Sequence, residues 1–177
     1  MPVSIIPFKM PEPAEIPAHI IDALKEMPAD EAVVKSMDLL MQIEAAETLV
    51  YERVNEKGQI QLMHVAGRRA DELNAALSAG SGSFAEAAIA QSSALLIMGQ
   101  ASAVEASALP SGAVEFLLAG AESGSIGFNY VLLFTGADDK ALGALTLMRA
   151  AEDGPLNHEQ PNICEAMRRE ISLILAV

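Results

Sequence analysis

Apolar residues recur every three or four positions in two segments near the start of the chain. Residues 16–27 show this spacing and stop before Pro28, and residues 30–44 repeat it with Asp30 placed as an N-cap. Proline ends a helix because it lacks the backbone N–H and clashes with the preceding turn. The pattern therefore predicts two consecutive helices separated at Pro28.

The last segment of the chain carries the same helical pattern. Asn157 is placed to cap this helix, with Gln160 three residues on as in a capping box, and Pro161 falls in the first turn, where proline is tolerated. We expect the helix to pack through one apolar face. That face would carry Ile163, Met167, Ile171 and either Ile174 or Leu175.

Between these helices the spacing changes to that of strands. Residues 48–54 and 59–66 flank a turn, NEKG, that is closed by Gly58. Residues 129–136 and 141–150 flank a second turn, ADDK. Both pairs are predicted to form antiparallel hairpins.

The region between the two hairpins is predicted to be mixed. A glycine-containing loop opens a short helix over 84–91, and a buried strand over 94–98 follows it. Residues 99–128, which we call the insert, are irregular in pattern apart from one helix predicted over 113–119.

The strand over 141–148 is apolar on both sides. Leu142, Ala144 and Met148 are expected to point one way, and Gly143, Leu145 and Leu147 the other. An antiparallel strand with one face in water alternates apolar and polar residues instead. Both faces must therefore be covered, which predicts an α+β fold with one antiparallel sheet between layers of helices.

The first 17 residues contain five prolines. Such a segment is expected to be an extended arm outside the core, because each proline removes a backbone donor and fixes φ. Its apolar residues suit a groove, such as one on a partner subunit. A frayed tail is the alternative for this arm. We therefore expect an arm with a short helix over residues 1–29 and the folded domain over 30–177.

Composition and charge narrow the functional classes. The 177 residues are 51% hydrophobic and carry a formal net charge of −13, which opposes binding to nucleic acid. Cys164 is the single cysteine, so an internal disulfide and a multi-cysteine zinc site are excluded. The longest uncharged run, 87–104, is too polar to span a membrane, and the first residues do not read as a signal peptide. We expect a cytoplasmic protein without a membrane association.

The order of these elements resembles that of a GAF domain, a sensory module of signalling proteins. The resemblance covers residues 30–177, and PAS-like sensors are the alternative. It is carried by four stretches in order: TLVYERVNEKGQIQLMHVAG, GSGSFAEAAIAQSSALLI, YVLLFTGADDKALGALTLMRA and GPLNHEQPNICEAMRREISLILA. It implies a six-stranded sheet with terminal helices on one face and a small-molecule pocket under the insert on the other. The sixth strand would be an edge strand within the insert.

The resemblance also implies partners. The terminal helices would form a homodimer, and the last helix would continue toward an output domain or signalling partner. The apolar end of the chain, ISLILAV, suits a dimer interface or a continuation that was removed.

Polar residues of the first hairpin are the leading ligand candidates. Tyr51, Arg53 and His64 are expected on one sheet face, where they either contact a small polar ligand or form a satisfied buried cluster. The apolar residues expected on that face are Leu49, Ile60 and Leu62. The apolar wall of a pocket would come from Phe84, Phe116, Phe128 and Tyr130.

Catalysis and metal binding find no support in the sequence. No nucleophile and base can be paired, and Cys164 falls in the last helix. The three histidines, His19, His64 and His158, do not have the spacing of metal ligands. Cyclic nucleotides are disfavoured because the insert has no Lys or Arg to meet a phosphate. We expect a non-enzymatic small-molecule sensor or regulatory domain, with a ligand-free dimerisation or scaffold module as the alternative.

Overall fold

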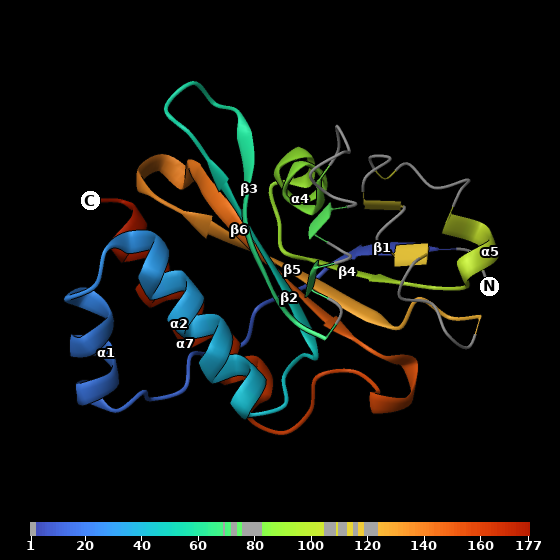
Figure 1. Ribbon diagram of the computed structural model, residues 1–177, viewed down its shortest axis with the longest axis horizontal. Helices are drawn as coiled ribbons and strands as arrows, with labels where there is room; N and C mark the ends of the chain where they lie inside the picture. Colours follow the sequence, from blue (N-terminus) through green and yellow to red (C-terminus); the bar gives the residue numbers. More distant parts are fainter. Residues whose placement is uncertain are drawn as a thin grey trace.

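A single six-stranded antiparallel sheet forms the centre of the molecule, with strand order β1-β4-β5-β6-β2-β3 (Figure 1). The computed structural model describes residues 3–68, 70–71, 74–75, 83–104, 109, 113–114, 117–118 and 124–177. The strands are β1 (Ser4–Pro7), β2 (Thr48–Val54), β3 (Ile60–Gly67), β4 (Leu95–Met98), β5 (Phe128–Thr135) and β6 (Ala141–Arg149). The α-helices whose bounds the structure describes are α1 (Ala18–Lys25), α2 (Ala29–Gln42), α4 (Phe84–Gln91), α5 (Ala101–Val104) and α7 (Gln160–Leu175). Short 3₁₀ turns, η1 (Ala137–Asp139) and η2 (Ala151–Asp153), flank β6. The predicted α+β fold class is confirmed.

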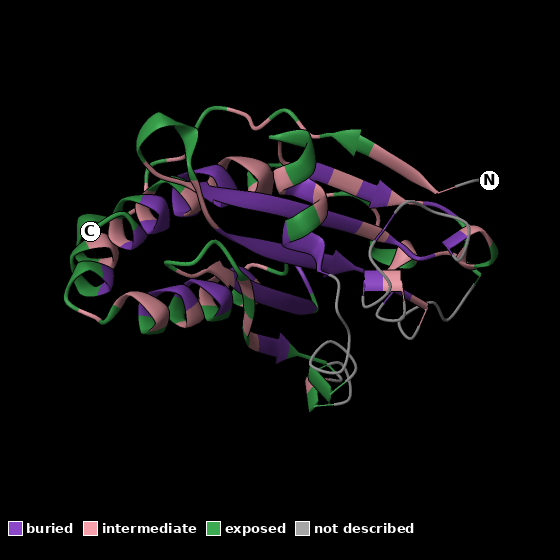
Figure 2. Cartoon of the chain, turned by 90° about the horizontal axis from the view of Figure 1, so that it is seen from above, coloured by how far each residue is buried: buried purple, intermediate pink, exposed green. Residues whose placement is uncertain are grey.

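Helices cover both faces of the sheet. Helices α2 and α7 lie side by side on one face, with α1 beside α2, and α4 lies on the opposite face (Figure 1). We call these the α2/α7 face and the α4 face. Each face has its own cluster of buried apolar side chains. The central strands are consequently buried along most of their length (Figure 2).

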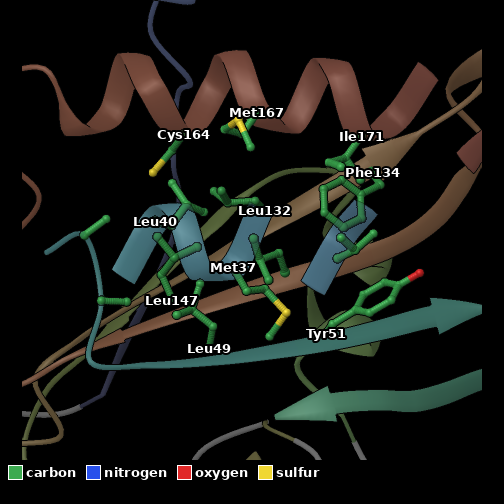
Figure 3. Close-up of a cluster of buried hydrophobic side chains, with 14 of the residues drawn as sticks. Met37, Leu40, Leu49, Tyr51, Leu132, Phe134, Leu147, Cys164, Met167 and Ile171 are labelled. Atoms are coloured by element: carbon green, nitrogen blue, oxygen red, sulfur yellow. The ribbon is translucent and has the colours of Figure 1, made fainter. Parts of the chain in front are cut away.

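The α2/α7 face carries the larger side chains. Figure 3 shows side chains of α2 and α7 packed against side chains of β2, β5 and β6. The predicted apolar face of the last helix is confirmed, because Met167, Ile171 and Leu175 are each less than a tenth exposed.

Strand β6 is two-sided, as predicted, with one correction. Leu145 and Leu147 belong to the cluster on the α2/α7 face, and Ala144 and Met148 belong to the cluster on the α4 face. Leu142 was expected with Ala144 but packs against the α2/α7 cluster. The reason is an irregularity in the ladder, where the register between β5 and β6 shifts and Leu142 has no residue of β5 opposite it.

The sixth strand comes from the proline-rich arm, so its predicted place in the insert is wrong. In the described part of the insert, Gln100 and Ser125 form only an isolated bridge. Strand β1 pairs antiparallel with β4 instead. Its apolar, β-branched residues suit a strand, and Pro7 is tolerated because β1 lies at the edge of the sheet.

The rest of the arm also contacts its own chain. The side chain of Asn162 donates to the carbonyl of Glu12 at 2.9 Å, and the N–H of Ala14 donates to the carbonyl of Asn162 at 2.9 Å. The arm therefore lies over the start of α7, and strands from both sides of residue 29 share one sheet.

The first hairpin turns as predicted at NEKG. The side-chain oxygen of Asn55 accepts hydrogen bonds from the N–H groups of Lys57 and Gln59, both at 2.9 Å. Gly58 takes a φ of +77°, which favours glycine over other residues.

Both predicted helix caps are wrong. Helix α2 begins at Ala29, one residue before the predicted range, and Pro28 precedes it. Asp30 lies in the first turn, and its carboxylate accepts a hydrogen bond from Tyr51 instead of capping the helix. Helix α7 begins at Gln160, because His158 takes a φ of +52° and interrupts any helix from Asn157. Half of the capping box survives, since Gln160 Oε1 accepts the N–H of Asn157 at 3.1 Å. Within the described ranges, the helices are too short or too polar to cross a membrane.

Candidate functional site

Tyr51 and Arg53 both bind Asp30 at the start of α2. The Tyr51 hydroxyl donates to Asp30 Oδ1 at 2.8 Å, and Arg53 Nη1 donates to the same oxygen at 2.9 Å. Burial raises the pKa of Tyr51, and the hydrogen bond to Asp30 raises it further, so the phenol remains a donor. Figure 3 shows the ring at the border of the apolar cluster. The three side chains bind one another and connect β2 to α2.

His64 lies directly across from Tyr51 in the ladder between β2 and β3. Opposed residues of an antiparallel pair share a face, so His64 is on the α2/α7 face, as predicted. The imidazole makes no hydrogen bond to the side chains or backbone that the structure describes, and it is half-buried. His64 is thus brought beside Tyr51 without joining the Asp30 cluster.

Ile60 and Leu62 do not share this face, contrary to the prediction. The register shifts between Tyr51 and Glu52, so that Tyr51 opposes His64 while Glu52 opposes Leu62. Met63 is left as the extra residue of a bulge, and the side chains of Ile60 and Leu62 are turned to the α4 face. A bulge of this kind leaves no trace in the apolar pattern of QIQLMHVA.

The predicted aromatic wall is divided by the sheet. Tyr130 lies on the α2/α7 face, where its ring meets that of Phe8 edge-on at 5.0 Å and its hydroxyl accepts the N–H of Leu156 at 3.1 Å. Phe84 is fully buried on the α4 face. Phe116 lies outside the described residues. The predicted residues therefore do not line one pocket.

Glu52 is a buried carboxylate on the α4 face that sequence reasoning missed. It is 3% exposed, and its Oε1 accepts the N–H of Ala85 at the start of α4 at 3.1 Å. Burial raises the pKa of Glu52 above its usual range, while hydrogen bonds from Ser83, Ala85 and Phe84 offset part of this rise. Ser83 itself caps α4, with its Oγ accepting the N–H of Glu86 at 3.0 Å. Glu52 thus binds the positive end of the α4 dipole.

Asn129 leaves a buried acceptor without a partner. Its Nδ2 donates to the carbonyls of Ile97 at 3.1 Å and Ile126 at 3.0 Å. Two carbonyl acceptors fix which end of the amide is nitrogen, so Oδ1 is the free end. This oxygen is buried and has no hydrogen-bond partner among the described residues.

Thr146 is the second such group. It is fully buried, and its Oγ1 also has no partner among the described residues. Thr146 lies opposite Val131 in the ladder and Asn129 lies opposite Met148, so the two polar residues are diagonal neighbours. Both point to the α4 face, since the alternate residues Tyr130 and Leu147 belong to the other cluster.

The described residues around these two groups are apolar and carry no positive charge. The cluster on the α4 face includes Val50, Phe84, Ala88, Ile97, Val131 and Met148. Among the described residues, Arg149 is the only buried basic side chain, and it lies on the α2/α7 face. Leaving a buried polar atom unpaired costs about 1–3 kcal/mol, so two of them in one apolar cluster require an explanation.

Arg149 is a structural clamp that the sequence did not reveal. Its guanidinium donates to the carbonyls of Gly154 at 2.8 Å, Glu44 at 2.7 Å, Ala45 at 2.9 Å and Asp153 at 3.1 Å. A polar surface cavity of about 500 Å³ lies beside it. The guanidinium has five N–H donors, and carbonyls of its own chain take four of them. Arg149 therefore joins three chain segments and has little capacity left for a ligand.

Cys164 is a buried, protonated thiol, and the described residues do not group side chains that could hold a metal ion. Cys164 is 1% exposed within the α2/α7 cluster, and burial raises the pKa of its thiol to about 12, which keeps it protonated. No group of three or more His, Cys, Asp or Glu in the described ranges is placed to hold a metal ion.

Neither a scan with protein-family models nor a search of curated protein sequences found a match to the chain. The function is therefore inferred from the geometry and chemistry of the α4 face.

Proposed function

We propose that this chain is a non-enzymatic, cytoplasmic regulatory domain of the GAF type that binds a small molecule at the α4 face. The observation that carries the proposal is the pair of buried, unpartnered atoms, Asn129 Oδ1 and Thr146 Oγ1. A domain that served only as a scaffold would gain stability from apolar side chains at these positions. A ligand that satisfies both atoms would account for their presence in an apolar cluster.

Strand β2 supplies a route from this face to the terminal helices. Glu52 binds the start of α4, and its neighbours Tyr51 and Arg53 bind Asp30 of α2 on the other face. A ligand that favours one packing of the α4 face would bias the position of β2, and with it the start of α2. The output would then be a change in the packing of the terminal helices.

The same helices are proposed to form the homodimer. A groove of about 550 Å³ at the end of α7 is lined by Lys25, Met27, Ala29, Leu173, Ile174 and Val177. Leu173 is 62% exposed there and Val177 is also exposed, so the groove presents apolar side chains to solvent. Contact with a second copy or with an output domain would cover this groove.

The alternative is a ligand-free dimerisation or scaffold module. It is favoured by the close packing of the α4 face, where Phe84, Ala85 and Ala88 are fully buried. Under this alternative the two unpartnered atoms would be met by trapped water.

Native mass spectrometry of protein purified without refolding distinguishes the two functions. We expect a dimer that carries a discrete additional mass, and we expect Thr146→Val to lose that mass while remaining a dimer. The matched control is Thr48→Val, because the Thr48 hydroxyl already donates to the carbonyl of Arg68 at 3.0 Å. A dimer without added mass in all three proteins would favour the scaffold, and a monomer would contradict the proposed interface.

A further inference from the structure

We infer that the α4-face site takes an uncharged ligand whose polar group both donates and accepts hydrogen bonds, as a primary carboxamide does, and that it rejects anions. This inference rests on the proposed function and specifies the chemistry of its ligand. It follows from the hydrogen-bonding capacity that is left at Asn129 and Thr146, and from the charge of their surroundings.

The free group of Asn129 is an acceptor only. The amide nitrogen is held by the carbonyls of Ile97 and Ile126, so the side chain cannot turn over to offer its N–H groups. The buried Oδ1 therefore needs a donor from the ligand. A carboxylate or phosphate oxygen has no hydrogen to offer, which excludes acceptor-only groups at this position.

Thr146 supplies the complementary half. Its hydroxyl carries one hydrogen to donate and lone pairs to accept. Diagonal neighbours on an antiparallel pair lie about 7 to 8 Å apart at Cα. Both atoms are buried without accessible surface, so a ligand must displace side chains of the α4 face to reach them. One polar group placed between Asn129 and Thr146 would then donate to the first and accept from the second. A primary carboxamide has both functions, and a hydroxyl group has them as well.

Charge decides against ions. The described residues place no buried Lys or Arg on this face, while the Glu52 carboxylate is negative and lies on β2, two residues from Val50, which opposes Thr146 of β6. Burying an anion here would leave its charge unpaired in an apolar cluster, which is strongly unfavourable. A cation is not favoured either, because the Glu52 carboxylate is already bound by the N–H of Ala85 at the start of α4. A neutral ligand remains.

Acetamide and acetate test this inference because they have the same shape and differ only in charge and donors. Both are added at equal concentrations to ¹⁵N-labelled protein, and the side-chain N–H₂ signals of Asn129 are followed with the backbone signals of Val131 and Thr146. We expect acetamide to shift these signals and acetate to leave them unchanged. Thr146→Val should weaken the acetamide response about two- to tenfold, the value of one lost hydrogen bond. Thr146→Ser keeps the hydroxyl and should preserve the response even if the valine variant is poorly folded.

The outcomes separate the inference from the proposed function. If acetate shifts the signals and acetamide does not, the ligand class is wrong while small-molecule binding at this face stands. If neither solute acts but the native mass spectrum shows a retained molecule, the carboxamide inference is again overturned and the proposed function stands. If neither solute acts and no mass is retained, both are overturned.

Discussion

Tyr51 and Glu52 are consecutive residues of β2, yet they bind helices in opposite layers of the molecule. The Tyr51 hydroxyl donates to Asp30 of α2 at 2.8 Å, and Glu52 accepts the N–H of Ala85 of α4 at 3.1 Å. The pleat of a strand turns neighbouring side chains to opposite faces, so one strand holds both helix layers. We propose that a shift of β2 at this position is transmitted to both layers.

The hydroxyl of Thr146 should contribute no stability in ligand-free protein. Thr146→Val removes an unpartnered buried group at nearly constant shape, so after unfolding and refolding to remove any ligand we expect an unchanged free energy of unfolding or a gain of about 1 kcal/mol. Thr48→Val, which removes a hydrogen bond of 3.0 Å, should lose about 1 kcal/mol. Urea denaturation measures both. Equal losses in the two variants would mean that Thr146 has a partner, such as a trapped water.

The Asp30 cluster should stabilise the attachment of α2 to the sheet. Tyr51→Phe removes one hydrogen bond and should lower the free energy of unfolding by about 1 kcal/mol. Asp30→Ala should cost more, because it removes the acceptor of both Tyr51 and Arg53. Glu31→Ala is the matched control, since Glu31 is an exposed acidic residue in the same turn and should change stability by less than about 0.5 kcal/mol.

The double variant completes this test. If Tyr51 acts through Asp30, Tyr51→Phe should cost much less in the Asp30→Ala background than in the wild type. Fully additive losses would show that the hydroxyl stabilises the protein by another contact.

Glu52 should make stability fall as pH rises. Its folded-state pKa lies above the ordinary glutamate value of about 4.3, so the folded protein holds this proton more tightly than the unfolded chain does. The contribution of Glu52 to the free energy of unfolding is fully present below the ordinary glutamate pKa and is lost as pH rises through the folded-state pKa. Glutamine does not titrate, so the stability of the wild type minus that of Glu52→Gln should decrease across this window. A difference that increases with pH would contradict the assignment.

Glu165 provides a comparison of opposite sign. Burial favours its neutral form, but hydrogen bonds from Arg168 and Arg169 outweigh burial and lower the pKa of Glu165. The contribution of Glu165 to the free energy of unfolding is present above about pH 4.3 and is lost as pH falls through the folded-state pKa. The stability of the wild type minus that of Glu165→Gln should therefore decrease toward acid, in the same urea titrations.

Removing β1 should expose a strand edge. Deletion of residues 1–7 leaves β4 unpaired on its outer side, and an unpaired edge of apolar sequence (LLIM) favours self-association. We expect concentration-dependent larger species in sedimentation velocity. Ile6→Lys is the control, because Ile6 is already 42% exposed and the backbone pairing of β1 is kept. A deletion variant that sediments like the wild type would contradict a structural role for β1.

The elements of the fold were largely predictable because their apolar spacing is local. The helix over Phe84–Gln91 and both hairpins match the prediction closely, and the two-sided pattern of β6 correctly required helices on both faces. Strand β1 was missed because its partner lies some ninety positions away and its segment is rich in proline, which by itself indicates an extended arm. The bulge at Met63 was missed because one extra residue changes the face of Leu62 without changing the apolar pattern.

The candidate site was hardly predictable at all. Glu52 is the one acidic residue of β2, and its partner Ala85 is 33 residues away. Asn129 and Thr146 each have apolar or aromatic residues on both sides in the sequence, and only the register between β5 and β6 makes them neighbours. No spacing rule links such residues, whereas the aromatic residues that did stand out, Phe84 and Tyr130, are core residues of opposite faces.

The backbone signals of the first turn of α2, recorded during the acetamide titration, test the regulatory claim most directly. We predict that Asp30 and Glu31 shift together with Asn129 and Thr146, and that Tyr51→Phe weakens the shifts in α2 while leaving those on the α4 face. Shifts confined to the α4 face would contradict the transmission of ligand binding through β2 to the terminal helices.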